Sequence, residues 1–302
     1  MTLADWVSDT RTRINQNGFS GAKRSVLELG VGVARRLDRR FPFGQPIYEQ
    51  DWDVLIILDA CRADLMAEVE NDYSFVDTES MTSLAGGSRT WMQRNFAEKY
   101  RENTRETAYI TGNPFSDEVL VDGWFENMEE VWKYAWEDEL NTVPARGMTD
   151  VAIHEHRRHD PKRMIVHYMQ PHHPFVPNPM DSGMNKDNLK NPDDPIWQQV
   201  KKGDADKDEV WQAYQENLRY VLDDVSLLLQ NLDAESVVVS ADHGNAIGEW
   251  GFYGHGDVPI SAIREVPWCE TTAEDTGEYE PELEPQGDEL AVEEKLEDLG
   301  YL

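Results

Sequence analysis

Acidic and histidine side chains follow directly after two apolar runs in the chain. Asp59 ends the run Val54–Leu58, and Asp242 and His243 follow the run 236–240. Carboxylate oxygens and imidazole nitrogens are ligands that zinc and manganese bind in proteins. Asp59, Asp242 and His243 therefore predict a site for a divalent metal ion, provided that the fold brings the two segments together.

A third apolar run leads into a pair of histidines. The segment 163–175 reads "RMIVHYMQPHHPF" and places His172 and His173 in a loop rich in proline. Ligands of open parallel sheets lie outside the carboxyl ends of the strands. Since three apolar runs end in polar or metal-ligating groups, we expect those ends to meet at one edge of a sheet.

The elements that position these residues are strands alternating with helices. Short apolar runs without alternation are typical of strands buried on both faces of a parallel sheet. We expect strands at 54–58, 107–115, 163–175 and 236–244, and helices at 62–71, 117–160 and 208–232. This alternation predicts an α/β fold with a mostly parallel central sheet flanked by helices.

The ends of the chain differ in composition from its middle. Residues 1–50 are expected to be a helical segment packed on the core, and residues 51–268 to be the catalytic domain. Residues 269–302 hold 13 acidic residues and one lysine, which predicts an acidic tail with a short terminal helix. Residues 176–206 are rich in Pro, Asp and Asn and are interpreted as a long excursion.

The overall charge is strongly negative. The formal charge is −31, with 59 acidic against 28 basic residues, yet the chain holds 10 tryptophans, which disordered chains lack. We interpret this as a globular protein of the halophilic type, whose carboxylate surface is screened in a salt-rich cytoplasm. Equal melting temperatures at low and molar KCl would contradict that interpretation. Binding to nucleic acid is not expected, because phosphates attract Lys and Arg.

A cytoplasmic location is expected. No stretch of about 18 apolar residues is present to span a membrane. The N-terminus has no apolar signal core, and two cysteines make no disulfide framework. Residues 25–41 could form a basic amphipathic helix, which either packs on the domain or makes a peripheral contact with a membrane surface.

Four segments resemble the sulfatase-like branch of the alkaline phosphatase superfamily. They read "DVLIILDACRADL", "HYMQPHHPF", "SADHGNAIGEWGFYGHGDVPISAIREVPW" and "KLEDLGYL", and occur in the family's order. The resemblance implies an alkaline-phosphatase-like α/β fold and a metal ion that activates a side-chain nucleophile attacking phosphorus or sulfur. It implies Asp59, Asp242 and His243 as ligands of that ion.

The same resemblance assigns roles to three more histidines. His255 in "GHG" matches a histidine that members with two metals use as a ligand. His172 matches the histidine of the family's H-x-P-F/Y pattern, which binds substrate or metal, and we predict a catalytic role for it. His173 matches less well and is predicted to bind substrate.

Cys61 invites comparison with the cysteine that sulfatases oxidise to formylglycine. The family motif is Cys-x-(Pro/Ala)-x-Arg, but Leu65 stands where the arginine is required. Cys61 also follows Asp59 by two residues, whereas the family's nucleophile comes some 30 residues later. We therefore predict that Cys61 is a small buried hydrophobe, and that Arg62 and Asp64 pair at the strand-to-helix turn.

The nucleophile is expected between residues 80 and 96, a segment without cysteine. A serine or threonine there would act as the nucleophile. Ser88 is favoured because it follows two glycines and precedes a predicted helix, whose N–H groups would stabilise an oxyanion. Thr90 is the second candidate, and Thr82 and Ser83 remain open.

Together these features predict a metal-dependent hydrolase or transferase that acts on phosphate mono- or diesters through a Ser or Thr nucleophile. One or two divalent ions are expected, with zinc or manganese favoured and magnesium or calcium open. Arg89 is predicted to contact the transferred group. The substrate is expected to be a small molecule or a glycan- or lipid-linked ester. Two alternatives are a sulfatase without formylglycine and a non-catalytic metal-containing module.

Overall fold

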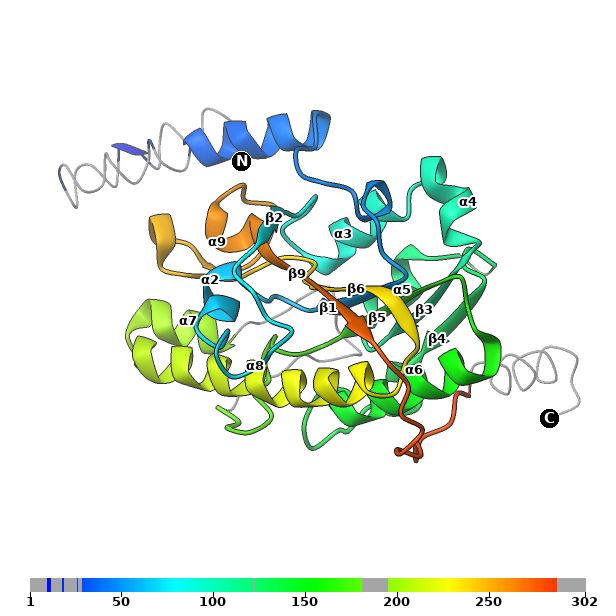
Figure 1. Ribbon diagram of the computed structural model, residues 1–302. Coiled ribbons are helices and arrows are strands. Elements are labelled where there is room, and N and C mark those ends of the chain that lie inside the picture. The colour runs from blue at the N-terminus through cyan, green and yellow to red at the C-terminus, as the bar shows by residue number, and fades with distance from the viewer. Residues whose placement is uncertain are drawn as a thin grey trace, which may run out of the picture.

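The structure is a computed structural model that describes residues 29–121, 123–180 and 195–286, with residues 10, 11, 18 and 26. Figure 1 shows a central sheet with helices α6 (Ala145–His159) and α8 (Lys207–Leu229) running along one side. Helix α3 (Ser88–Asn95) and an N-terminal helix at residues 29–40 lie on the other. This arrangement confirms the predicted α/β fold with helices flanking the sheet.

Seven strands form the sheet in the order β2-β9-β6-β1-β5-β3-β4. All neighbouring pairs on the β6-to-β4 side are parallel, whereas β9 runs antiparallel to both β6 and β2. Their bounds are β1 Val54–Leu58, β2 Ser80–Thr82, β3 Thr107–Thr111, β4 Asn127–Glu130, β5 Arg163–Tyr168, β6 Ala234–Ser240 and β9 Glu265–Ala273. The sheet is thus mostly parallel, as predicted.

Strand β1 lies at the centre of the sheet, between β5 and β6. All five of its residues are buried because helices cover both faces, which explains the uninterrupted apolar run VLIIL. The carboxyl ends of β1, β3, β5 and β6 point to the same edge because these strands are parallel. The segments that follow them therefore converge on one place.

Shorter elements complete the fold. A two-stranded antiparallel ribbon pairs β7 (Ala246–Ile247) with β8 (Tyr253–Gly254). The other helices are η1 Ile47–Glu49, α2 Ala63–Ala67, η2 Glu98–Tyr100, α4 Arg101–Thr104, α5 Phe115–Val119, η3 Val131–Lys133, α7 Pro195–Lys202, η5 Glu249–Gly251 and α9 Ser261–Arg264. Helix α8 begins at an N-cap, where the Asp206 carboxylate accepts from the amides of residues 208 and 209.

The helix predicted over residues 117–160 is wrong for most of its length. Only α6 is a long helix there, and it begins after Pro144. The Trp- and Glu-rich part instead forms β4, which pairs with β3 and completes the edge of the sheet. Glutamate favours helices locally, but pairing with an exposed strand edge outweighs this weak preference.

Strand β9 runs across the predicted boundary between residues 268 and 269 and continues to Ala273. Its strand pattern was hidden by the density of acids, although Cys269 is fully buried beside exposed Glu270. The residues after β9 contact the rest of the domain, and the Tyr279 hydroxyl donates to the Asp150 carboxylate at 2.7 Å. The predicted terminal helix lies outside the described residues.

The N-terminal segment joins the body by buried charge and by apolar packing. Asp38, in the helix at residues 29–40, is only 2 % exposed and pairs with Arg94 and Arg264. Ile47 and Tyr48 belong to the main hydrophobic core, so that core begins before residue 51. None of the helices in the described part of the chain is long and apolar enough to cross a membrane.

Candidate active site

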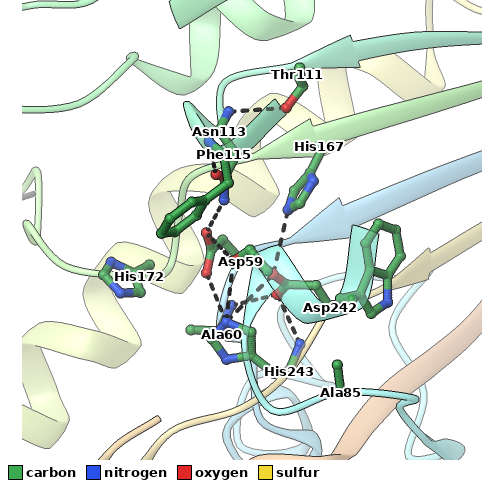
Figure 2. Close-up of polar contacts among 12 residues, drawn as sticks. Asp59, Ala60, Ala85, Thr111, Asn113, Phe115, His167, His172, Asp242 and His243 are labelled. Atoms are coloured by element: carbon green, nitrogen blue, oxygen red, sulfur yellow. Dashed lines mark hydrogen bonds and ion pairs between the residues drawn. The ribbon is translucent and has the colours of Figure 1, made fainter. Parts of the chain in front are cut away.

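Asp59, Asp242 and His243 form a buried cluster beyond the carboxyl ends of β1 and β6. Each offers one ligand atom, and these atoms lie within 4.8 Å of one another. All three side chains are at most 1 % exposed. Figure 2 shows the two carboxylates facing each other, with His243 on one side and Asn113 on the other. The fold therefore unites the two segments that the sequence predicted as one site.

The Asp242 carboxylate has one oxygen fixed by the backbone. Its Oδ1 accepts from the amide of Ala60 at 3.1 Å and from the amide of His243 at 2.8 Å. Ala60 adopts a left-handed conformation with φ of 62° at this turn. Oδ2 has no hydrogen-bond partner among the described residues. This second oxygen faces the cluster.

Asp59 is held in the same way, by different partners. Its Oδ2 accepts from Asn113 Nδ2 at 2.9 Å and from Ser88 Oγ at 3.3 Å. Its Oδ1 has no hydrogen-bond partner in the described part of the chain. Buried carboxylate oxygens without partners are costly unless a proton or a cation satisfies them.

His243 presents a lone pair to both carboxylates. Its Nδ1 lies 2.9 Å from the carbonyl of Gly244, which can only accept, so this nitrogen carries the proton. The other nitrogen, Nε2, lies 3.5 Å from Asp59 Oδ1 and 3.5 Å from Asp242 Oδ2. Three electron-rich atoms thus converge without a donor between them. Two carboxylates and one imidazole suit zinc or manganese, so these residues fit a divalent cation.

The pKa values of the two acids move in opposite directions. Burial and then the negative charge of Asp242 raise the pKa of Asp59 well above its ordinary value. Burial also acts to raise the pKa of Asp242, but His243 and His167, when they carry a positive charge, outweigh burial and hold that pKa low. Without a cation, a proton on Asp59 relieves the repulsion between the two acids, and a bound cation would replace that proton.

Ser88 brings a hydroxyl to the cluster. It is the first residue of α3, it is 4 % exposed, and Gly87 before it is extended. Its Oγ lies 3.3 Å from Asp59 Oδ2 and 3.4 Å from His243 Nε2. No side chain caps the start of α3, so the first-turn N–H groups remain available to an anion.

The other predicted hydroxyls lie elsewhere. Thr90 follows Ser88 by two residues on α3, which turns it about 200° around the helix axis, away from the Ser88 side. Ser83 donates to the backbone carbonyl of Asp242, behind the carboxylate. Thr82 belongs to β2 and pairs with Glu265 of β9. Among the four candidates, Ser88 is the one whose hydroxyl contacts the acid cluster in the described structure.

A second group of histidines adjoins the cluster. The rings of His243 and His255 stack with centroids 4.4 Å apart, and His255 Nε2 lies 3.2 Å from His172 Nε2. His255 therefore faces His172 and stands outside the three-residue group that could hold one ion. Burial lowers the pKa of His172 to about 4 and that of His255 well below its ordinary value. Both rings are neutral at neutral pH.

His173 lies behind His172. Their rings stack with centroids 4.2 Å apart, and the His173 ring meets Trp197 of α7 edge-on. It is 3 % exposed, and burial lowers its pKa well below the ordinary value. The predicted contact of His173 with substrate would require the rings of His172 and Trp197 to move away from it.

Arg89 points away from the cluster. Its guanidinium pairs with Glu118 at 2.9 Å, and its side chain is 48 % exposed. The predicted contact with a transferred group would require the arginine to leave Glu118. The two residues before the helix, Gly86 and Gly87, join this segment to the His255 loop, since the Gly256 amide donates to the Gly86 carbonyl at 2.7 Å.

Sequence reasoning missed three residues that support the site. Asn113 ends the second predicted strand and donates to Asp59. His167 is fully buried in β5, with Nε2 3.7 Å from Asp242 Oδ2. Asn217 of α8 donates to the carbonyls of residues 171, 172 and 174 and so holds the His172 loop. The position of Asn113 at a strand end was a usable signal, whereas the other two depend on packing.

Cys61 and its neighbours behave as predicted. Cys61 is fully buried in the main core, and burial raises the pKa of its thiol well above the ordinary value. Arg62 donates two hydrogen bonds, of 2.7 and 2.6 Å, to the Asp64 carboxylate and also pairs with Glu249 at 2.7 Å. Cys61 is therefore a packed thiol next to a structural ion pair.

Comparison with known proteins gives the family. The sulfatase family model matches residues 74–266, which is more than half of the chain, and the chain therefore belongs to the sulfatase family. The matched range holds Ser88, Asp242 and His243, whereas Asp59 precedes it. A search of curated proteins returns no match.

Among solved structures, three similar chains are bacterial phosphoethanolamine transferase domains. The soluble domain of lipooligosaccharide phosphoethanolamine transferase A from Neisseria meningitidis is 12% identical at a TM-score of 0.45, covering 72% of this chain and 75% of that one. The periplasmic domain of EptC from Campylobacter jejuni is 14% identical at 0.40, covering 72% and 78%. The Escherichia coli EptC domain, in complex with Zn, is 12% identical at 0.43, covering 77% and 76%. These likenesses are too distant to transfer an activity.

Proposed function

We propose that this chain is a metal-dependent hydrolase or transferase of phosphate esters, with Ser88 as the nucleophile. The observation that carries the proposal is the position of Ser88 Oγ, within 3.3 to 3.4 Å of Asp59 Oδ2 and His243 Nε2. A nucleophilic hydroxyl needs neighbours that orient it and favour its ionised form. This hydroxyl has both kinds of neighbour at the edge of the sheet.

Phosphorus is favoured over sulfur because the site lacks a cysteine that could become formylglycine. Cys61 lies in the core, and the loop that carries Ser88 contains none. A sulfatase that uses an unmodified serine is the alternative, and a non-catalytic metal-containing module is the second. Both are separated from the proposal by the experiment below.

Asp59, Asp242 and His243 would hold the cation through Oδ1, Oδ2 and Nε2, the atoms that face one another. Bound there, a divalent ion would supply positive charge beside the reacting oxygens and favour ionisation of a neighbouring hydroxyl. Zinc or manganese suits this donor set, and a second ion would draw on His172 and His255.

The chain's own residues orient the reaction. The Ser88 hydroxyl donates to Asp59 Oδ2, which points the lone pairs of Oγ away from that carboxylate. Attack forms a bond from Oγ to phosphorus and breaks the bond to the leaving oxygen, which takes up the proton that Ser88 gives up. A water molecule in a hydrolase, or an acceptor hydroxyl in a transferase, then displaces Oγ from phosphorus and gives its own proton to Ser88.

Two features could bind the non-bridging oxygens of the phosphoryl group. The uncapped start of α3 offers backbone N–H groups on the Ser88 side. His255 could donate from Nε2, whereas His172 Nδ1 donates to the His173 carbonyl and leaves its own Nε2, 3.2 Å from His255 Nε2, as an acceptor. Donors aimed at developing charge are usually the largest single contribution to such catalysis.

The test compares Ser88→Ala with Thr90→Ala, a matched change on the same helix. Protein purified in high salt is assayed for metal by elemental analysis and for turnover of aryl phosphate, bis-aryl phosphate and aryl sulfate. We expect Ser88→Ala to retain metal and to lose turnover of a phosphate ester by roughly 10³-fold or more. Thr90→Ala should stay within about threefold of the native rate, since Thr90 does not face the cluster.

Other outcomes point elsewhere. An unchanged rate in Ser88→Ala with a loss in Thr90→Ala would move the nucleophile. Faster turnover of aryl sulfate would support the sulfatase, and bound metal without turnover of any ester would support the non-catalytic module. A cytoplasmic location, a salt-rich environment and a glycan- or lipid-linked substrate stay predictions, and cell fractionation tests the first.

A further inference from the structure

The N-terminal helix leaves a line of large apolar side chains in solvent. Val33, Leu37 and Phe41 are 47, 57 and 67 % exposed, and Leu29 is 40 % exposed. Residues three or four apart lie on the same side of a helix, so these side chains form one stripe. We call Leu29, Val33, Leu37 and Phe41 the apolar stripe. Exposed patches of this kind mark interaction surfaces.

The stripe is turned outward because the opposite side of the helix is anchored. Asp38 is buried and pairs with Arg94 of α3 and Arg264 of α9. Arg35 Nε donates to the carbonyl of Asp257 at 3.0 Å. At 100° per residue, Asp38 and Arg35 lie roughly 140° and 160° from Val33. The body therefore fixes which side of the helix faces out.

Positive charge lies beside the stripe and, at Arg40, within it. Arg36 and Arg40 lie within about 60° of Val33 around the helix axis and are exposed, and Arg39 is exposed further round. They contrast with a chain whose formal charge is −31. An apolar stripe with arginines along its side is the arrangement by which helices lie in the interface of an anionic bilayer.

We propose that the helix at residues 29–40 lies on an anionic membrane surface, with the apolar stripe inserted and Arg36 and Arg40 at the lipid headgroups. A second copy of the chain fits less well. The other large apolar side chains exposed in the described part of the chain are Val26, Phe43, Val121 and Trp250, which form no matching stripe. Pairing two such helices would also bring their arginines together.

The anchored side connects the helix to the candidate active site. Asp38 contacts α3, whose first residue is Ser88, and Arg35 contacts a residue two positions after His255. An ester carried by a lipid would then lie beside the site. This consequence rests on the proposed function, whereas membrane binding itself does not.

The experiment is co-sedimentation of the full chain with vesicles, at low salt and in molar KCl. One set contains phosphatidylcholine alone, and the other contains equal parts of phosphatidylcholine and phosphatidylglycerol. Val33→Asp/Leu37→Asp removes the apolar contact and should weaken binding to the anionic vesicles at least about tenfold. Arg36→Gln/Arg40→Gln should weaken it about tenfold at low salt, and less in molar KCl where charges are screened.

Matched controls change equally exposed residues elsewhere. Val121→Asp alters an apolar side chain that is 62 % exposed, and Arg105→Gln/Arg158→Gln removes two exposed charges. Both should stay within about twofold of the native affinity, since neither lies on the helix. Far-UV circular dichroism and melting verify that each variant folds.

The proposal is overturned if the native chain binds neither vesicle set, or if the controls lose as much binding as the helix variants. It is also overturned if the chain is a dimer without lipid that Val33→Asp/Leu37→Asp dissociates. Since vesicle binding needs no turnover, its failure is distinct from failure of the Ser88 test.

Discussion

Two buried clusters that contain carboxylates contact α3, one at Ser88 where the helix begins and one at Arg94 near its end, and they differ in how their oxygens are satisfied. Asp38 places Oδ2 2.9 Å from Arg94 and Oδ1 3.1 Å from Arg264, so both oxygens are paired with cations. Asp59 and Asp242 each leave one oxygen without a hydrogen-bond partner in the described structure. Arginines of the chain pair with both oxygens of Asp38. The open oxygens of Asp59 and Asp242 need a proton or a cation instead.

This difference separates an acid that is paired within the chain from two acids that could hold a cation. A buried carboxylate paired with arginine holds segments together, and removing it leaves a buried charge. Two buried carboxylates that face a histidine lone pair repel each other until a cation or proton arrives. Changing one acid in each cluster should therefore affect different properties of the protein.

The largest expected effect is on turnover, from Asp242→Asn. Replacing this carboxylate removes one of three ligand atoms, so bound metal should be lost and turnover of a phosphate ester should fall roughly 10³-fold or more. Added zinc or manganese should raise the melting temperature of the native chain and of Asp38→Asn, but not of Asp242→Asn. Elemental analysis measures the bound metal, and thermal melting measures the shift in melting temperature. Full metal content in Asp242→Asn would show that the cluster is not the cation site.

The next effect is on stability, from Asp38→Ala. Arg264 is buried and would lose its partner, so the free energy of unfolding should fall by about 3–5 kcal/mol. The matched control is Asp64→Ala, which removes an exposed partner of Arg62 and leaves Glu249 in place. This change should lower the free energy of unfolding by at most about 1 kcal/mol. Urea unfolding of the metal-free proteins measures both, and equal losses would remove the distinction between the clusters.

Much of the acid cluster could be predicted from the sequence because it depends on strand ends. Asp59, Asp242 and His243 directly follow buried apolar runs, and parallel pairing then forces them together. Ser88 could be chosen because two glycines precede it and a helix follows it. These features are local, so a single stretch of chain reveals them.

The rest depends on contacts between distant segments. No local pattern shows that Asn217 of α8 holds the His172 loop, or that His167 faces Asp242 from within β5. The strand β4 was missed because a glutamate-rich stretch favours a helix until it meets the free edge of β3. The pairing of β9 with β6 was hidden in the same way by acids on its exposed side.

The smallest effect on turnover is expected from Gly86→Ala, a change two residues before Ser88. A Cβ at this position would collide with the carbonyl of Gly256, so the Ser88 segment and the His255 segment must separate. We expect turnover to fall about 10- to 100-fold through misplacement of Ser88, because small displacements of reacting groups are costly. The clash is with backbone atoms, so the melting temperature should fall as well, while the ion pairs of Asp38 persist.

Gly87→Ala is the matched control for this change. Its Cβ would meet His255 Nδ1 at 3.6 Å, an ordinary contact, and its backbone is extended. Turnover should stay within about threefold of the native value. Equal losses in the two variants would mean that the approach of the Gly86 and Gly256 backbones does not position Ser88.

The central place of β1 also governs how the chain can fold. β1 is the first strand in sequence, yet its two neighbours are β5 and β6, which begin at residues 163 and 234. During synthesis at about 5–20 residues per second, roughly 10 to 35 s pass before the second partner exists. Throughout that interval the apolar run VLIIL has at least one open edge, the kind of strand that pairs with other chains. The ligand cluster, which needs Asp242 and His243 just after β6, therefore assembles only after β6 has been made and has paired with β1.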